Sequence, residues 1–168
     1  MIVRDAEPED AAEVARVHVR AWQVGYRGLL PDEYLGGLRL EDRTRRYTFG
    51  DTRPDQPATI VAVLDGRILG FATTGPSRDE DVPGSGEVYA IYVSPQTWGR
   101  GIGGTLLIEA RARLLARGFT EAVLWVLAGN ERAQRCYRAD GWHRDGHRRE
   151  EDVGGVPTEV VRHRRRLD

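Results

Sequence analysis

The chain has 168 residues, of which 40% are hydrophobic and 30% are charged, and its formal net charge is −1. These values are typical of a globular domain and exclude a largely disordered or membrane-embedded chain, and they indicate no nucleic-acid or membrane partner. The length suits a single domain over residues 1–168 with one hydrophobic core.

Features that are missing from the sequence limit the cellular compartment and the catalytic chemistry that we expect. No apolar run approaches the roughly 20 residues that span a bilayer, and residues 1–10 do not combine a basic region with an apolar stretch as a secretory signal does. The lone Cys136 fits a reducing compartment, so we expect a cytoplasmic protein. All 25 Lys-or-Arg positions are arginine, which excludes lysine nucleophiles and Schiff bases.

The first part of the chain predicts a strand and two helices. Residues 2–7 alternate as in a strand, and a helix then opens at Pro8. A second, short helix is expected from Pro31 after a glycine-containing loop. One face of the first helix carries Val14, Val17, His18 and Ala21.

A hairpin and a further strand follow. Residues 58–75 contain two β-rich runs joined by Asp65 and Gly66, which is a typical hairpin signal. Residues 87–94 form a third β-rich run, and Pro95 ends it.

Helices and strands alternate in the second half. Residues 121–128 form a continuous apolar run, as in a strand that is covered on both faces. Asn130 is placed to cap a helix that runs to Ala139, and Gly141 stops it. An earlier helix, which Gly118 ends, carries on one face Leu106, Leu107, Ala110, Leu114 and Leu115.

The tail completes the predicted sheet. Residues 156–167 alternate like a strand and are expected to pair with residues 143–152. The elements together predict an α/β (α+β) fold, with a mixed, mostly antiparallel sheet of about seven strands and four helices.

A glycine-rich loop links the strand at 87–94 to the next helix and contains Gly99, Gly101, Gly103 and Gly104. Glycines let backbone N–H groups approach an anion, and a helix N-terminus adds partial positive charge, so the loop predicts a phosphate site. The dinucleotide fingerprint also fits the spacing, but it needs an acidic residue after the next strand, where this sequence has Leu127. A dinucleotide site is therefore the less favoured alternative, and a Walker loop fails because there is no lysine.

Two segments within residues 87–142 carry a stronger signal: "EVYAIYVSPQTWGRGIGGTLL" and "WVLAGNERAQRCYRADGW". They closely resemble the GNAT superfamily of acetyl-CoA-dependent N-acetyltransferases, whose signature is a strand ending in V-x-P, then Q/R-x-x-G-x-G/A opening a helix, a strand, an Asn and a Tyr before Gly-Phe. The resemblance implies splayed central strands and direct acetyl transfer to a primary amine of a small molecule or peptide. Many members dimerise, so a homodimer is one option. An acyl-CoA sensor without activity is the alternative function.

The resemblance also assigns the residues that bind acetyl-CoA. The backbone of Ile91, Tyr92 and Val93 would pair with the pantetheine arm as an added strand does. Asn130 and Ala133 would contact the same arm, although helix capping by itself explains Asn130. The pyrophosphate would be held by Gly99, Arg100, Gly101, Ile102, Gly103, Gly104 and Thr105.

Two catalytic roles follow from the same resemblance. Tyr137, seven residues after Asn130, stands at the general-acid position, and Glu87 at the start of the central strand corresponds to an acidic base. The alternatives are that Tyr137 only packs under its helix and that Glu87 is a solvated residue at a strand edge.

The acceptor side is defined less sharply. Trp22, Tyr26 and Tyr89 are candidates to line the acceptor pocket, and Trp22 also fits a core position. The acidic run 79–81 either attracts a cationic amine or is a solvated loop, and Trp98 either packs beside the glycine loop or stacks near the cofactor. We interpret Cys136 as a small buried hydrophobic residue, the scattered histidines predict no metal site, and the arginine-rich end predicts cross-strand charge pairs rather than a nucleic-acid contact.

Overall fold

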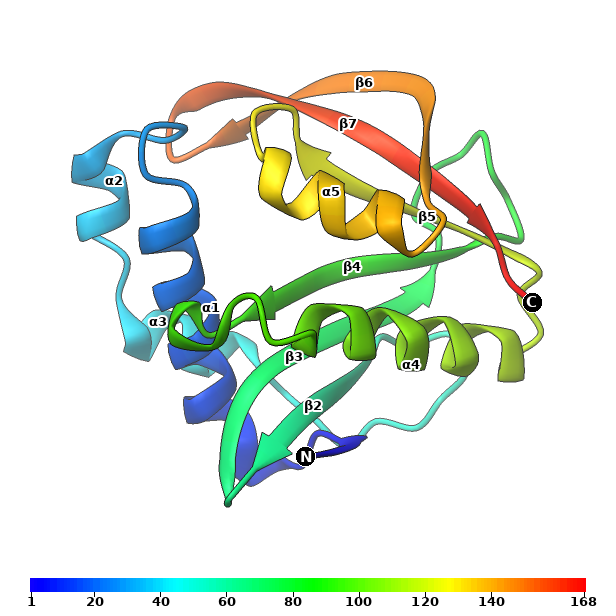
Figure 1. The fold of residues 1–168 in the computed structure, drawn as a ribbon, viewed down its shortest axis with the longest axis horizontal. Coiled ribbons are helices and arrows are strands. Elements are labelled where there is room, and N and C mark those ends of the chain that lie inside the picture. The colour runs from blue at the N-terminus through cyan, green and yellow to red at the C-terminus, as the bar shows by residue number, and fades with distance from the viewer.

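The computed structural model describes residues 1–168 and has one seven-stranded sheet in the order β1-β2-β3-β4-β5-β7-β6 (Figure 1). The strands are β1 Ile2–Asp5, β2 Ala58–Leu64, β3 Arg67–Pro76, β4 Gly86–Val93, β5 Glu121–Leu127, β6 His143–Val153 and β7 Val156–Arg166. The helices are α1 Ala11–Gly25, α2 Asp32–Gly36, α3 Leu40–Arg46, α4 Ile102–Ala116 and α5 Glu131–Ala139, with short 3-10 segments η1 Pro8–Asp10 and η2 Pro95–Thr97.

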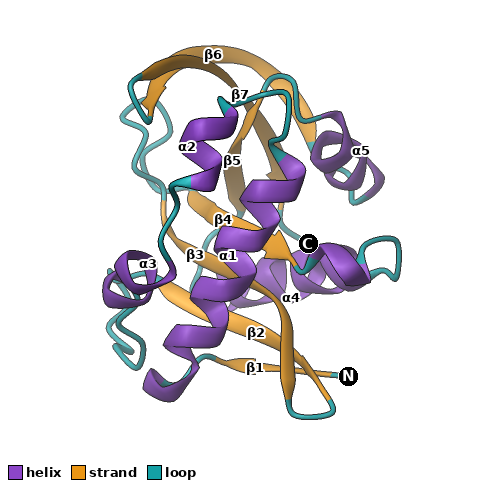
Figure 2. Ribbon diagram, turned by 90° about the vertical axis from the view of Figure 1, so that its left-hand side faces the viewer, coloured by secondary structure: helices purple, strands orange, loops and turns teal.

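Helices cover both faces of the sheet. Figures 1 and 2 show α4 and α5 on one face and α1 on the other. Because successive strand residues point to opposite faces, Ala72 of β3 packs in the cluster with Leu106 of α4, whereas its neighbour Phe71 packs with Val14 and Val17 of α1. Two apolar layers therefore enclose the central strands.

The sheet opens in the middle. Every neighbouring pair of strands is antiparallel except β4 and β5, which are parallel and paired only at Gly86–Val88 and Ala122–Leu124. Beyond Val88 the two strands diverge (Figure 1). The β3–β4 register shifts at the same point and leaves Tyr89 without a partner, and such a bulge bends a strand. The bulge therefore marks the place where β4 leaves β5.

The predicted sheet, its mostly antiparallel order and its splayed central strands are confirmed. Asp65 and Gly66 both take positive φ (51° and 75°), as the hairpin turn requires, and β6 pairs with β7 as expected. The prediction of four helices was wrong, because α3 is a fifth. Its sequence, "LEDRTRR", buries no residue, so there was no apolar periodicity to indicate it. No helix has the combination of length and apolar character that crossing a membrane requires.

Candidate active site

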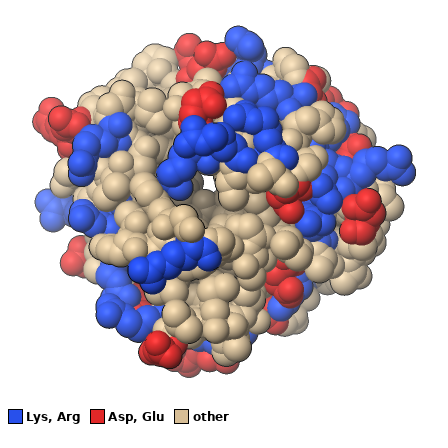
Figure 3. All heavy atoms as spheres, viewed as in Figure 1, with Lys and Arg blue, Asp and Glu red and all other residues tan.

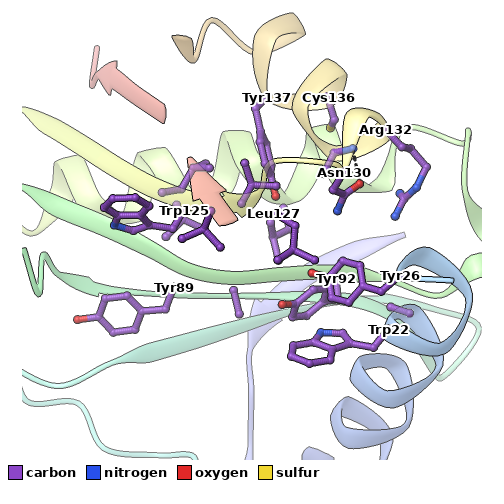
Figure 4. A pocket seen from close by; sticks show the side chains of 18 of the residues that line it. Trp22, Tyr26, Tyr89, Tyr92, Trp125, Leu127, Asn130, Arg132, Cys136 and Tyr137 are labelled. Atoms are coloured by element: carbon purple, nitrogen blue, oxygen red, sulfur yellow. Dashed lines mark hydrogen bonds between the residues drawn. The ribbon is translucent and has the colours of Figure 1, made fainter. Parts of the chain in front are cut away.

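A cavity of about 360 Å³ lies where β4 and β5 diverge (Figure 4). Its walls come from the two strands, the end of α1, the start of α4, the inner face of α5 and side chains of β6 and β7. Aromatic and aliphatic side chains dominate the lining, with a few charged groups among them. Residues that were expected at the site from distant parts of the sequence meet in this cavity. The lining includes Trp22, Tyr26, Glu87, Tyr89, Asn130 and Tyr137.

Three of the four phenols that line this cavity lie close together, and the fourth belongs to Tyr89. Tyr137 reaches down from α5 toward the strand that carries Tyr92, and Tyr26 extends from the end of α1 (Figure 4). Burial raises the pKa of each of the three phenols above its ordinary value, and each lies close enough to influence another. All three are therefore neutral near pH 7, in the form that donates a hydrogen bond.

The hydroxyl of Tyr137 is free for a ligand. The ring packs edge-on against His163, with 5.9 Å between centroids, and only 7% of the residue is exposed. Packing under the helix thus holds the ring, whereas the hydroxyl makes no hydrogen bond within the protein and points into the cavity. Packing under the helix therefore accounts for the ring, and the general-acid role of the hydroxyl stays a prediction.

Glu87 is not a solvated residue at a strand edge. Its side chain is 1% exposed, and Arg78 binds it through Nη2 at 2.6 Å and through the backbone N–H at 3.0 Å. A buried carboxylate needs such partners because desolvation of an unpaired charge is costly. The ion pair holds Glu87 against the cavity wall next to Tyr89.

The glycine loop is open toward solvent. Gly99 and Gly101 have φ values of +79° and +80°, a conformation that favours glycine, and a Cβ at either would meet nothing within 4 Å. α4 starts directly after Gly101, so the free N–H groups of its first turn, those of Ile102, Gly103 and Gly104, adjoin this space, whereas the N–H of Thr105 donates to the Gly101 carbonyl at 3.0 Å. Gly103 of the same turn lines the cavity. The loop and the cavity are therefore continuous, and Arg100 lies exposed beside them.

The edge of β4 that faces β5 has no strand partner from Tyr89 to Val93. Ile91, Tyr92 and Val93 pair only with β3, opposite Ala72, Phe71 and Gly70. This free edge can bind an extended ligand by main-chain hydrogen bonds.

Asn130 caps α5, as its position predicts. Its Oδ1 accepts a hydrogen bond from the backbone N–H of Ala133 at 3.2 Å, and the dashed line in Figure 4 marks this bond. The amide NH₂ of Asn130 makes no hydrogen bond within the protein, although the residue is 8% exposed and lines the cavity. One end of the side chain caps the helix, and the other stays available to a ligand.

Arg132 is a residue of this site that the sequence analysis missed. Its guanidinium lies 3.5 Å from the centroid of the Trp98 ring, and the indole Nε1 of Trp98 donates to the Val93 carbonyl at 2.8 Å. Trp98 therefore packs beside the glycine loop and supports Arg132. The available signal was a basic residue in the first turn of the helix that Asn130 caps, because the resemblance already assigned Asn130 and Ala133 to the cofactor. Figure 3 shows arginine side chains gathered beside a hollow near the centre of this face, between the places where Figure 1 shows the start of α5 and the loop before α4.

The acidic run 79–81 is only partly solvated: Glu80 and Asp81 are exposed, whereas Asp79 is nearly buried and, like Asp81, is paired with an arginine. Arg162 of β7 is 1% exposed and binds Asp79 at 3.1 Å and Asp81 at 2.8 and 2.7 Å. Asp79 also accepts a hydrogen bond from the indole N–H of Trp125 at 2.8 Å. These carboxylates fix the loop between β3 and β4 to the other half of the sheet.

Comparison with known proteins agrees with this geometry. Residues 19–142 match the model of the acetyltransferase (GNAT) family. The chain is 32% identical over 128 residues to the N-acetyltransferase YuaI of Bacillus subtilis, an alignment that covers 76% of this chain and 72% of that protein. An N-acetyltransferase of Archaeoglobus fulgidus is 30% identical over 146 residues, which cover 86% and 94% of the two chains. The chain belongs to the GNAT acetyltransferase family.

Other proteins share only the domain or the fold. The mycothiol acetyltransferase of Kocuria rhizophila is 37% identical over 134 residues, 75% of this chain but only 44% of that protein. The PaiA N-acetyltransferase of Thermoplasma acidophilum, solved with coenzyme A, has a TM-score of 0.71, 19% identity and 98% coverage of both chains. YncA of Salmonella typhimurium, solved with acetyl-CoA, has a TM-score of 0.73 and 18% identity, and 99% of this chain and 94% of that chain are covered. At these identities the structures establish the shared fold.

Proposed function

We propose that this protein transfers an acetyl group from acetyl-CoA directly to a primary amine of a small molecule or peptide. The observation that carries the proposal is the continuity of the site. The open glycine loop leads through Gly103 into a cavity that holds both Tyr137 and Glu87. Acetyl transfer from a thioester that carries phosphate groups requires a phosphate-binding loop and two proton-transfer groups. One cavity joins all of these here.

The features of the chain fit acetyl-CoA. The open space above Gly99 and Gly101 and the N–H groups of α4 suit a pyrophosphate, and Arg100 and Arg132 supply positive charge beside it. The unpaired edge of β4 suits the amide groups of pantetheine, and the free NH₂ of Asn130 suits one of its carbonyls. The thioester would then lie between the diverging strands.

The residues of the cavity can supply each step of the transfer. Glu87, directly or through water, takes a proton from the ammonium group of the acceptor, whose nitrogen then attacks the thioester carbonyl. A backbone N–H at the bulge of β4 stabilises the negative charge that develops on the carbonyl oxygen. The C–N bond forms, the C–S bond breaks, and Tyr137 donates a proton to the departing sulfur. The second proton of the nitrogen returns to the Tyr137 phenolate, directly or through water, and Glu87 releases the first proton to solvent. The products are the acetamide and free CoA.

The high pKa of Tyr137 is compatible with this role. Burial that raises the pKa of a phenol also raises that of a thiol nearby, as it does for Cys136 on the same helix. A thiolate that leaves in this cavity is therefore a stronger base than in water, and a neutral phenol aimed at it favours its departure.

Two measurements test the proposal. The melting temperature should rise with acetyl-CoA and with CoA but not with NADH, because only a ligand of the native state stabilises it. Gly101→Glu, which puts bulk and negative charge into the loop, should abolish the shift. Thiol release with a panel of amines then separates an enzyme from a sensor. A shift with NADH alone would support the dinucleotide alternative instead.

A further inference from the structure

The cavity has two chemically different ends. Figure 4 shows Asn130 and Arg132 at one end and Tyr89 and Trp125 at the other. The first end adjoins the glycine loop and is the cofactor end. The second end, next to Glu87, is where an acceptor amine would meet the thioester. This assignment rests on the proposed function.

Each wall of the acceptor end carries an arginine stacked on an aromatic ring. The guanidinium of Arg78 lies 4.1 Å from the centroid of Tyr89, which belongs to β4. The guanidinium of Arg149 lies 4.0 Å from the centroid of Trp125, which belongs to β5. Stacking holds a guanidinium flat and leaves its N–H edge free for an anion.

The two arginines differ in how many donors are already used. All three nitrogens of Arg149 are engaged, with Glu151 at 3.0 and 2.6 Å and with Asp79 at 3.3 Å. Arg78 uses only Nη2, on Glu87 at 2.6 Å, and its side chain is 60% exposed. Its Nε and Nη1 make no hydrogen bond within the protein. Arg78 is therefore the cation of this end that can bind a further anion.

The carboxylates at the acceptor end, unlike Arg78, are already paired with arginines. Glu87 is bound by Arg78, Glu151 by Arg149, and Asp79 by both Arg149 and Arg162. A second positive charge on the acceptor would thus meet no unpaired carboxylate, whereas a negative charge would meet the free edge of Arg78.

We propose that the acceptor is an amine that carries a carboxylate close to the reacting nitrogen, as an α-amino acid does. Its ammonium group lies against Glu87 and its carboxylate binds Nε and Nη1 of Arg78. The ion pair between these two side chains, at 2.6 Å, offers opposite charges at a spacing that matches a zwitterion. While the carboxylate occupies Nε and Nη1 of Arg78, Nη2 and the backbone N–H of the same residue hold Glu87 beside the ammonium group.

The experiment compares matched acceptors in the wild-type protein. Each proteinogenic amino acid is tested beside its amide and its decarboxylated amine, with thiol release and mass spectrometry of the product as readouts. The kcat/KM of the best amino acid should exceed that of its two partners by about ten- to a hundredfold, as one charge-assisted contact predicts. In Arg78→Met the ratio should fall to about one, and Arg78→Lys should restore part of it. Arg45→Met, on the exposed surface of α3, should leave the ratio unchanged.

The test depends on the ratio of kcat/KM between an amino acid and its uncharged partners, measured within one variant. Any loss of kcat caused by disturbing Glu87 affects both acceptors and cancels in this ratio. Equal or better use of the amides and decarboxylated amines by the wild type would overturn the inference, and so would a failure of every amino acid to react. Neither result depends on whether Arg78→Met folds. Absence of any melting shift with acetyl-CoA would instead overturn the proposed function itself.

Discussion

The guanidinium of Arg132 stacks on the ring of Trp98 at 3.5 Å and so joins the start of α5 to the loop before α4. The two elements lie on either side of the opening between β4 and β5. Gly25 at the end of α1 completes the contact, since a Cβ there would lie 3.3 Å from Nη2 of Arg132 and 3.6 Å from the Trp98 ring. Three segments distant in sequence thus fix one positive charge beside the glycine loop.

Arg132→Met should weaken binding of CoA about tenfold, because one cation near the phosphates is lost while the apolar stem is kept. Isothermal titration at low and high salt measures this effect, which should shrink as salt rises. Arg138→Met is the matched control on the same helix, where the side chain is 48% exposed and has only Glu131 at 3.6 Å as a partner. Equal losses in both variants would mean that Arg132 has no special place at the cofactor.

Tyr137→Phe should lower kcat about a hundredfold and leave the Kd for CoA unchanged, because the ring and its packing on His163 are retained while the proton donor is lost. Burial raises the pKa of Tyr137 above its ordinary value of 10.0, so the neutral phenol persists beyond pH 10. The wild-type pH–rate profile should therefore show no loss from this group up to about pH 10. Unaltered turnover in the Phe variant would remove Tyr137 from the reaction.

Glu87→Gln can keep only one of the two hydrogen bonds that Arg78 donates, because the amide has one acceptor oxygen, and it removes the proton acceptor. We expect kcat/KM at neutral pH to fall about a hundredfold and to recover partly at high pH, where more of the acceptor amine is already neutral. A full pH–rate profile measures both. A profile that coincides with that of the wild type would show that the proton leaves by another route.

Two buried histidines should make the fold sensitive to acid. Burial, followed by nearby arginines, lowers the pKa of His18 to about 3 and that of His163 to about 4. An unfolded histidine binds a proton near pH 6.5, whereas these two stay neutral in the folded state down to their lowered pKa. The unfolded state therefore binds more protons in this window, and stability falls as the pH drops from about 6.5 toward 4.

His163→Phe tests this dependence at a side chain whose two ring nitrogens are buried without partners. Between pH 6 and pH 4 the free energy of unfolding of the variant should fall by about 1 kcal/mol less per pH unit than that of the wild type, because one of the two acid-sensitive groups is gone. Urea unfolding at several pH values measures the slope. An unchanged slope would mean that His163 takes up its proton without unfolding.

Arg162 connects the two halves of the open sheet, because it extends from β7 to three carboxylates, those of Asp79, Asp81 and Asp145. Arg162→Met should lower the free energy of unfolding by about 2–3 kcal/mol, since the buried Asp79 and Asp145 each lose one charged partner while Arg149 and Arg164 still bind them. Arg148→Met, whose partner Glu159 lies at 3.1 Å on the surface, should cost less than about 1 kcal/mol. In Arg162→Met the KM for the acceptor should also rise while the Kd for CoA stays constant. Equal changes in the KM for the acceptor and the Kd for CoA would contradict a role of Arg162 that is confined to the acceptor end of the cavity.

The sequence by itself determined the elements whose signal is local. The Asp65–Gly66 turn, the Asn130 cap and the glycines before α4 each depend on the conformational preferences of a few adjacent residues, and the structure has them where they were expected. The resemblance carried by residues 87–142 likewise located the family, because its motifs lie within one continuous segment.

Only the tertiary structure decided which charges are free. Glu87 and Arg78 are nine residues apart, Arg162 lies more than eighty residues beyond Asp79, and nothing in their local sequence indicates that they pair. The bulge at Tyr89 and the divergence of β4 from β5 likewise arise from pairing between strands rather than from any one of them. Ion pairs and cavities are contacts between distant segments. A linear pattern can therefore nominate Glu87, Tyr89 and Tyr137 for one site, but only the folded chain shows what each of them touches.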